Sequence, residues 1–283
     1  MDIIHSPHQM QALMLTRRQA GQTIVFVPTM GFLHEGHLSL LREGRRRGDV
    51  LVLSIFVNPT QFGQGEDYAD YPRDLEKDCA QASACGVDVV FAPTAQQMYP
   101  SGYATEVNVT GITEVLCGAS RPTHFKGVCT VVAKLFHIVQ PQVALFGTKD
   151  FQQLAVVRRL TEDLNLPIEI VGMPIYREAD GLALSSRNVY LTTEQRRQAL
   201  SLSQGIALAR DLVSRGERDS IRVADQVRQR LTAHPEVRVD YVAICHQRTL
   251  TEQAVIDADS VLLLAAFVGR TRLIDNGRLM DAA

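Results

Sequence analysis

The sequence has few of the features that mark secreted or membrane-spanning chains. Its cysteines are odd in number and form no CxxC pair, so we expect no disulfide framework; they are Cys79, Cys85, Cys117, Cys129 and Cys245. The longest apolar run has eight residues, Val261 to Val268, far fewer than the about 20 that cross a bilayer. The opening MDIIHSPHQM lacks the basic start and apolar core of a signal peptide. These absences predict a cytoplasmic protein without a membrane partner.

An excess of charge of either sign is also missing. Lys and Arg number 29 and Asp and Glu number 31, which leaves a net charge of −2. Such a chain has no broad basic surface to hold a nucleic-acid backbone, so we expect no nucleic-acid partner, although local anion sites are compatible with it. Apolar residues make up 46% and charged residues 21%, as in globular proteins, and 283 residues suggest about two domains.

Short β-branched apolar runs alternate with amphipathic segments over about the first 170 residues. The runs are typical of strands buried on both faces and cover residues 23–28, 50–57, 87–91 and 143–146. The segments of helical length are 36–47, 74–84, 127–139 and 151–164. This alternation predicts an α/β fold, a Rossmann-like doubly wound parallel sheet with helices on both faces. Ligands of such sheets bind beyond the carboxyl ends of the strands.

The order of the elements changes after residue 192. Two helices are expected at 193–216 and 221–233, followed by strand candidates at 237–244, 261–268 and 271–275. Helices followed by strands indicate a separate, smaller α+β unit. We therefore predict a Rossmann-like domain over residues 1–175, and a C-terminal domain over residues 176–283 that acts as a lid.

The first motif, PTMGFLHEGH at 28–37, joins the first long strand to its helix. Free backbone N–H groups and the positive end of the dipole at a helix start attract phosphate. His34 and His37 are three residues apart and project from one face, where two imidazoles can donate to a phosphoryl group. Two surface histidines without function are the simpler interpretation of the pair alone, but the context of strand, PTMG, HxGH and helix favours a nucleotide site. A zinc protease is disfavoured because HExxH places its histidines four apart.

A second polar group, NPTQ, follows the second strand. Asn58 and Gln61 can hold hydroxyl and carboxylate groups without carrying charge, although a simple strand-ending turn explains the same residues. The next segment, residues 63–68, is rich in glycine, and we hypothesise that it acts as a lid.

Two further motifs carry positive charge. In FGTKD, at another strand-to-helix junction, Lys149 stands where triphosphate oxygens would lie, and Asp150 either caps the next helix or binds ribose. Gln153 lies one helical turn further on. In READGLALSSRN, Ser185, Ser186 and Arg187 form a suitable set for β- and γ-phosphates, although a polar linker is the simpler interpretation of this segment alone.

Together the four motifs resemble the pantothenate synthetase (pantoate–β-alanine ligase) family, within the nucleotidylyltransferase superfamily that carries the HxGH signature. The resemblance covers about residues 22–190 and includes SRPTHFKGVCTVVAKLF at 120–136. Thr148 and Tyr176 depart from the family pattern, which more often has an acidic and a smaller residue there. The resemblance implies ligation in two steps. ATP and pantoate give pantoyl adenylate and pyrophosphate, and β-alanine then gives pantothenate and AMP.

The resemblance also implies residue roles. His37, as proton donor, His34, Lys149 and Arg187 would be catalytic, and Gln61 would bind β-alanine. Pantoate would be held by Gln61, Gln153 and Asn58. The ATP site would comprise Met30, Gly31, Phe32, Leu33, His34, Glu35, Gly36, His37, Gly147, Thr148, Lys149, Asp150, Tyr176, Leu184, Ser185, Ser186 and Arg187. Mg²⁺ would accompany ATP through phosphate oxygens and water, and the chain would form a homodimer.

Two other functions are considered. A nucleotidylyltransferase would move AMP onto a phosphorylated acceptor and keep it in the product, and a non-catalytic ATP-binding module would need no second substrate pocket. A tRNA-charging enzyme is disfavoured by the short C-terminal region and the net charge.

Overall fold

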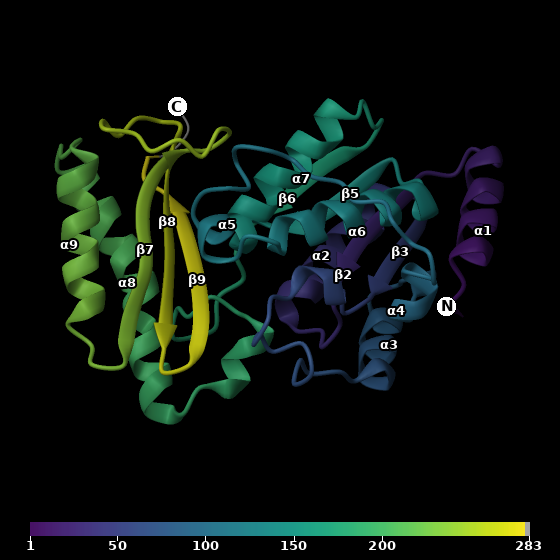
Figure 1. Ribbon diagram of the computed structural model, residues 1–283, viewed down its shortest axis with the longest axis horizontal. Helices are drawn as coiled ribbons and strands as arrows, with labels where there is room; N and C mark the ends of the chain where they lie inside the picture. Colours follow the sequence, from purple (N-terminus) through teal and green to yellow (C-terminus); the bar gives the residue numbers. More distant parts are fainter. Residues whose placement is uncertain (281–283) are drawn as a thin grey trace.

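The computed structural model describes residues 1–280 and contains two sheets (Figure 1). The larger sheet has six parallel strands in the order β1-β4-β3-β2-β5-β6. Its strands are β1 (Asp2–Ile4), β2 (Ile24–Thr29), β3 (Val50–Ile55), β4 (Val89–Phe91), β5 (Val143–Gly147) and β6 (Glu169–Met173). Strand β2 lies between β3 and β5, so the chain builds the sheet outward from β2 in both directions. This arrangement confirms the predicted doubly wound α/β fold.

Alternate side chains of β2 are buried on opposite faces of the sheet. Ile24 and Phe26 belong to a core with α1 (Pro7–Gln19), α6 (His124–Val139) and α7 (Phe151–Asp163). Val25 and Val27 belong to a second core with α2 (Glu35–Arg47) and α3 (Leu75–Ala84). All four side chains are fully buried, which explains why the run is uniformly apolar rather than alternating.

The smaller sheet is antiparallel, in the order β7-β8-β9, and lies beside the parallel sheet (Figure 1). It comprises β7 (Val237–His246), β8 (Ser260–Val268) and β9 (Thr271–Arg278), and it packs with α8 (Thr193–Ser214) and α9 (Ser220–Thr232) around a core of its own. The predicted α+β unit is therefore confirmed as an architecture, while the exact division at residue 175 stays a prediction.

Short elements complete the chain and include some that the sequence did not suggest. They are η1 (Pro59–Gln61), α4 (Ala95–Met98), α5 (Cys117–Ser120), η2 (Thr148–Asp150) and η3 (Ser186–Tyr190). Strands β1 and β6 and helix α1 were not predicted. Both strands are at edges of the sheet, where one is only three residues long and the other is half-exposed, so neither has a strong apolar pattern.

All five cysteines are free. Among the helices in residues 1–280, none is both long and apolar enough to cross a membrane.

Candidate active site

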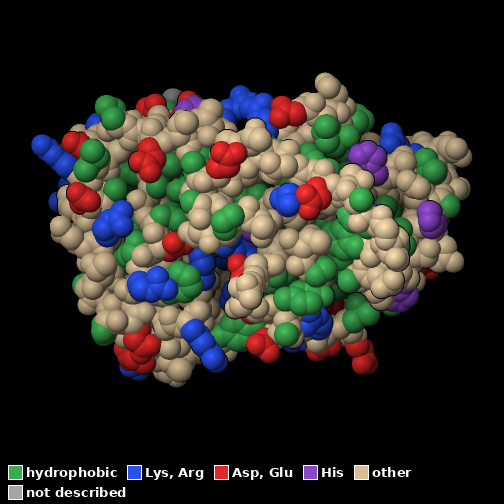
Figure 2. Space-filling view, in the orientation of Figure 1, with side chains coloured by type: hydrophobic (Ala, Val, Ile, Leu, Met, Phe, Trp, Pro, Cys, Tyr) green, Lys and Arg blue, Asp and Glu red, His purple; other side chains and the backbone are tan. Residues whose placement is uncertain are grey.

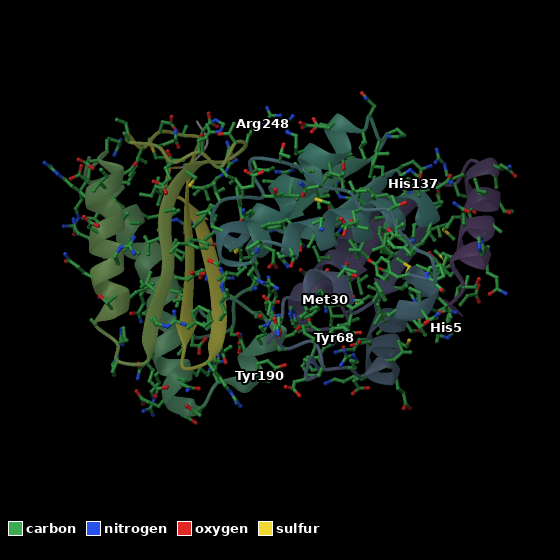
Figure 3. All side chains as sticks on the ribbon, viewed as in Figure 1. His5, Met30, Tyr68, His137, Tyr190 and Arg248 are labelled. Atoms are coloured by element: carbon green, nitrogen blue, oxygen red, sulfur yellow. The ribbon has the colours of Figure 1, made fainter. Side chains whose placement is uncertain are left out.

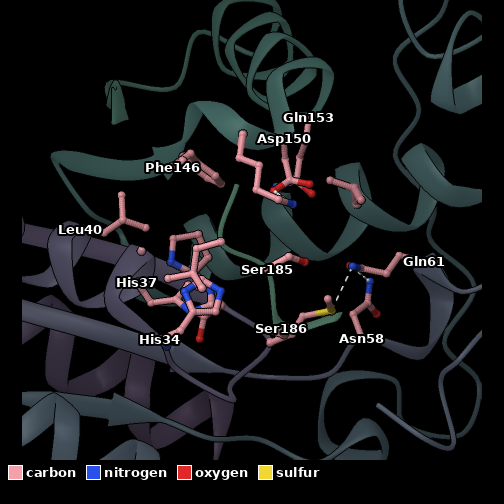
Figure 4. Close-up of a pocket in the computed structure, with 18 of the residues that line it drawn as sticks. His34, His37, Leu40, Asn58, Gln61, Phe146, Asp150, Gln153, Ser185 and Ser186 are labelled. Atoms are coloured by element: carbon pink, nitrogen blue, oxygen red, sulfur yellow. Dashed lines mark hydrogen bonds and ion pairs between the residues drawn. The ribbon is translucent and has the colours of Figure 1, made fainter. Parts of the chain in front are cut away.

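The carboxyl ends of β2, β3 and β5 open into one cavity of about 230 Å³. The loop after β2 supplies His34 and His37, the turn after β3 supplies Gln61, and the turn after β5 supplies Lys149. In Figure 4 the two histidines lie on one side of the cavity and Asn58 and Gln61 on the opposite side. Met30 directly follows β2 and is labelled near the middle of the molecule in Figure 3. The cavity is therefore at the edge of the sheet that the fold class predicts.

The structure brings most of the predicted site residues to this cavity. Those that line it are Met30, His34, Gly36, His37, Asn58, Gln61, Gly147, Lys149, Asp150, Gln153, Tyr176, Leu184, Ser185, Ser186 and Arg187. Gly31, Phe32, Leu33, Glu35 and Thr148 do not line it. Glu35 instead pairs with Arg42 at 3.0 Å on the surface of α2. The predicted ATP-binding residues are thus gathered around one cavity, apart from these five.

His34 and His37 are stacked, with ring centroids 4.0 Å apart, at the start of α2. Burial, and next the charges of His34 and Lys149, hold the pKa of His37 well below its ordinary 6.5. Burial and then Lys149 lower the pKa of His34 to about 4. Both rings are therefore neutral near pH 7, since a proton on either would lie beside the other ring and the lysine.

The tautomer of His37 follows from its backbone contact. The N–H of His34 donates to Nδ1 of His37 at 3.4 Å, so the ring proton is on Nε2 and that N–H is free to donate elsewhere. Nδ1 of His34 is buried without a partner. A Cβ on Gly36 would be 3.0 Å from this ring, closer than ordinary van der Waals contact, so a larger residue there would press on the His34 ring.

Asp78, on α3, holds the loop that precedes the histidines. Its carboxylate accepts from the N–H of Phe32 at 2.8 Å and from that of Leu33 at 2.7 Å. Phe32 and Gly31 both have positive φ, and the Asp78 side chain is 1% exposed. Sequence reasoning missed this residue. The available signal was an acid four residues before Ala82, on the buried face of a predicted helix.

Asn58 and Gln61 form a hydrogen-bonded pair. Nδ2 of Asn58 donates to Oε1 of Gln61 at 3.1 Å and to the carbonyl of Gly127, while its Oδ1 accepts from Tyr99 and Thr60. The polar atoms of Asn58 are therefore engaged by the protein. Nε2 of Gln61 contacts the sulfur of Met30 at 3.2 Å, so its amide faces the cavity beside that loop (Figure 4).

Gln153 and Gln152 are neighbours in sequence with different surroundings. Gln153 lines the cavity. Gln152 is 5% exposed and is held by three backbone groups, those of Ile112, Val115 and Cys117.

Asp88, whose role the sequence left open, lies apart from the cavity. Its carboxylate accepts from the Arg45 guanidinium at 2.6 Å and from the N–H of Leu51 at 2.7 Å.

Strand β9 contributes two residues that sequence reasoning missed. Nδ2 of Asn276 donates to the carbonyl oxygens of Thr148 and Lys149, at 2.9 and 2.8 Å. Asp275 is 3% exposed and pairs with both terminal nitrogens of Arg177, at 2.7 and 2.9 Å. The small sheet thus fixes the lysine loop, and it also fixes the segment that leads to Ser185.

Cations dominate one wall of the cavity. Lys149 has a side chain 19% exposed, with Nζ 3.9 Å from the Asp150 carboxylate. Arg187 forms a two-point pair with Asp67 at 2.8 and 2.9 Å, with Tyr71 against the guanidinium. Figure 2 shows basic side chains in a hollow near the middle of this face. Asp150 is the only acid among the described residues that line the cavity. Within residues 1–280, no group of three His, Cys, Asp or Glu side chains could hold a metal ion.

Comparisons with known proteins agree on one family. The family model described as Pantoate-beta-alanine ligase matches residues 2–278. Pantothenate synthetases of Syntrophotalea carbinolica and Trichlorobacter lovleyi are 58% and 59% identical to this chain over 281 residues. The matches cover 99% of this chain and 99% of each relative. The crystal structure of pantoate-beta-alanine (pantothenate synthetase) from Thermus thermophilus matches with a TM-score of 0.94 at 46% identity, covering 99% of both chains.

A more distant solved structure is described with ligands. It is the pantoate-beta-alanine ligase from Francisella tularensis complexed with beta-gamma ATP and beta-alanine. Its TM-score is 0.79 at 31% identity, and the match covers 99% of this chain and 98% of the other.

We expect Asp78→Ala to destabilise the fold by about 1–3 kcal/mol, because two buried N–H groups lose their acceptor. We also expect weaker nucleotide binding, because the loop carrying His34 is released. Urea unfolding and titration with ATP measure the two effects. Glu76→Ala, at an exposed position of the same helix, is the matched control. Unchanged ATP affinity in a folded Asp78→Ala protein would show that this carboxylate does not position the loop.

Stability should fall as the pH is lowered from 6.5 to 4. Burial, and then the Arg121 guanidinium, lower the pKa of His124 to about 4. The pKa of His34 is lowered to a similar value by burial and Lys149. The unfolded chain therefore binds protons below 6.5 that the folded chain refuses, which removes up to about 3 kcal/mol per histidine as the pH approaches 4. Unfolding free energies at pH 7.5, 6 and 5 measure the slope.

Substitution identifies the source of that slope. We expect His124→Gln to flatten the decline and His8→Gln, at an exposed position of α1, to leave it unchanged. Parallel declines in all three proteins would contradict the assignment.

Proposed function

The chain belongs to the pantoate–β-alanine ligase family and is an ATP-dependent ligase of pantothenate biosynthesis, and we propose that it works through a pantoyl-adenylate intermediate formed in the cavity described above. The observation that carries the proposal is the meeting of two kinds of surface in one cavity. His34, His37 and Lys149 suit a polyphosphate, whereas Gln61 and Gln153 suit a small hydroxy acid.

In the first step a carboxylate oxygen of pantoate attacks the α-phosphorus of ATP. The new O–P bond forms as the bond to pyrophosphate breaks, and negative charge builds on the phosphoryl oxygens and on the leaving group. Lys149 and Arg187 meet this charge as cations, while the Nε2–H of His37 donates a hydrogen bond as a neutral ring. His34 stacks beside it and fixes its position. Preorganised donors in a buried site stabilise such charge strongly.

In the second step the amine nitrogen of β-alanine attacks the acyl carbon of the adenylate. A C–N bond forms, the C–O bond to AMP breaks, and the amine gives up a proton. The mixed anhydride must be kept from water between the steps. The ion pair between Asp67 and Arg187 joins the 63–68 segment to the SSR segment, which supports the hypothesis that this loop acts as a lid.

The residues present fit a Mg²⁺ ion that arrives with ATP. Asp150 is a single carboxylate within the cavity, half-exposed, and no three-residue set of metal ligands accompanies it among residues 1–280. We propose that the ion is held mainly by phosphate oxygens and water, with Asp150 as the nearest protein carboxylate. When bound it neutralises phosphate charge.

We further propose that Asn58 supports Gln61 rather than touching pantoate, because its polar atoms are already engaged. Gln61 and Gln153 remain the proposed pantoate residues.

Dimerisation, which the family resemblance implies, stays a proposal, and light scattering of the purified chain tests it.

The reaction is tested by measuring AMP and pyrophosphate release from ATP, Mg²⁺ and pantoate, with and without β-alanine. We expect steady AMP release only when both substrates are present. Pyrophosphate release without AMP, sustained on a phosphorylated acceptor, would instead indicate a nucleotidylyltransferase. ATP binding without turnover in the folded protein would indicate a binding module.

His37→Ala and Lys149→Ala should each slow adenylation by about 10²-fold or more, the scale of losing one preorganised donor. Single-turnover pyrophosphate release without β-alanine measures this step alone. His137→Ala, on the exposed side of α6, is the matched control and should release pyrophosphate at the normal rate. A near-normal rate in either site variant would refute its assigned role.

A further inference from the structure

A second cavity, of about 70 Å³, adjoins the one described above. The two share Lys149, Asp150, Gln153, Ser185 and Arg187. Its volume is several times the about 10–15 Å³ that a single water needs, so a small molecule can enter it. Arg121, His124, Arg272 and Asn276 are among the residues that line it.

Arg121 lies at the boundary between this cavity and the pantoate side of the site. Its terminal nitrogen donates to the carbonyl oxygen of Gln61 at 3.2 Å, and the Nδ1–H of His124 donates to the same oxygen at 2.8 Å. The guanidinium is therefore next to the residue proposed to bind pantoate. Its side chain is only 17% exposed, so an anion reaching it is largely shielded from water.

The guanidinium of Arg121 already binds one carboxylate, that of Glu66. Nε of Arg121 contacts Oε1 of Glu66 at 2.6 Å, and a second nitrogen contacts the other oxygen, which is the two-point geometry that suits a carboxylate. The next residue, Asp67, forms the same type of pair with Arg187. One loop thus places adjacent carboxylates on two arginines that line adjoining cavities.

The two arginines differ in what they are needed for. Arg187 follows Ser185 and Ser186 in the segment proposed to bind the phosphates of ATP. The Asp67 carboxylate therefore occupies a position that a phosphate group would take. The second step of the proposed reaction brings a further anion, the carboxylate of β-alanine, whose amine must reach the acyl carbon beside Gln61 and Gln153. Arg121 contacts the backbone oxygen of Gln61 and lines the same cavity as Gln153, and its guanidinium is arranged for a carboxylate.

We propose that Arg121 binds the carboxylate of β-alanine, and that Glu66 occupies this position until the substrate displaces it. The inference rests on the proposed function. Arg121 selects an amine that carries a carboxylate at its other end, and the second cavity holds the two carbons of β-alanine that lie between its amine and its carboxylate. Arg272 is directed elsewhere, since it pairs with Asp240 at 2.7 Å and contacts the sulfur of Cys117.

The test compares β-alanine with β-alaninamide, in which the carboxylate becomes a neutral amide. We expect Arg121→Ala to lower kcat/KM for β-alanine by about tenfold or more, the scale of a lost charge-assisted pair, and to leave kcat/KM for β-alaninamide unchanged. Pyrophosphate release from ATP and pantoate alone measures any separate loss that comes from the contact of Arg121 with the Gln61 backbone. Arg121→Lys should restore part of the preference for β-alanine. Arg215→Ala, which breaks an exposed pair with Asp211, is the matched control.

Two results would overturn the inference. One is an unchanged preference for β-alanine over its amide in Arg121→Ala. The other is a raised KM for ATP or weaker inhibition by pyrophosphate, which would assign Arg121 to the polyphosphate. If the wild-type protein releases no AMP in response to β-alanine, the proposed function itself fails, and the two failures are thereby distinguished.

Glu66→Gln keeps the test valid if Arg121→Ala does not fold. Removing the competing carboxylate should lower the KM for β-alanine by about threefold or more, because a neutral amide holds the guanidinium less strongly. An unchanged or raised KM would contradict the displacement of Glu66.

Discussion

The burial of β2 on both faces is the constraint that places the site. A strand covered by helices on each side has nowhere to expose polar groups except at its ends. Its neighbours β3 and β5 run parallel to it, so their carboxyl ends meet at the same edge. Residues 34, 61 and 149, far apart in sequence, therefore come together without any direct pairing between them. The chemistry lies in the turns, and the apolar strands determine where the turns are.

The electrostatics of the cavity follow from that burial. Burial and the charge of Lys149 keep both imidazoles in their neutral form, with one ring N–H each. The positive charge is therefore carried by lysine and arginine alone. A neutral ring can donate a hydrogen bond to a phosphoryl oxygen without the strong attraction that would hold pyrophosphate in place. In the proposed mechanism, fixed cations attract the nucleotide, and oriented neutral donors stabilise the charge that develops during the reaction. This division of labour requires no change in the protonation of either histidine near pH 7.

Local patterns predicted the long buried strands, the doubly wound sheet and the motifs at its carboxyl edge. They did not predict β1 or β6, because edge strands lack the uniform apolar run that marks β2 and β3. Nor did they predict Asp78, Asp275 or Asn276. Asp78 and Asn276 act on loops far away in sequence through backbone groups, which carry no side-chain signature, and Asp275 pairs with the Arg177 side chain, which is also far away in sequence. The four-motif resemblance supplied what the patterns could not, namely the assignment of Gln61 and Gln153 to pantoate.

The contacts of β9 change how the C-terminal region is understood. A lid that only covered a finished site would touch its rim, whereas Asn276 binds the carbonyl oxygens of the lysine loop itself. Asp275, nearly fully buried, would be left as an unpaired charge if Arg177 moved away, and such a charge is costly in the interior. Moving the small sheet as a body would therefore also move Lys149 and the segment leading to Ser185. The ion pairs of the loop of residues 63–68 join side chains that are 17% to 29% exposed, whereas the Asp275 carboxylate is only 2% exposed, so the loop pairs are more accessible to water. Admission of substrates is thus more easily achieved by that loop than by separation of the two sheets.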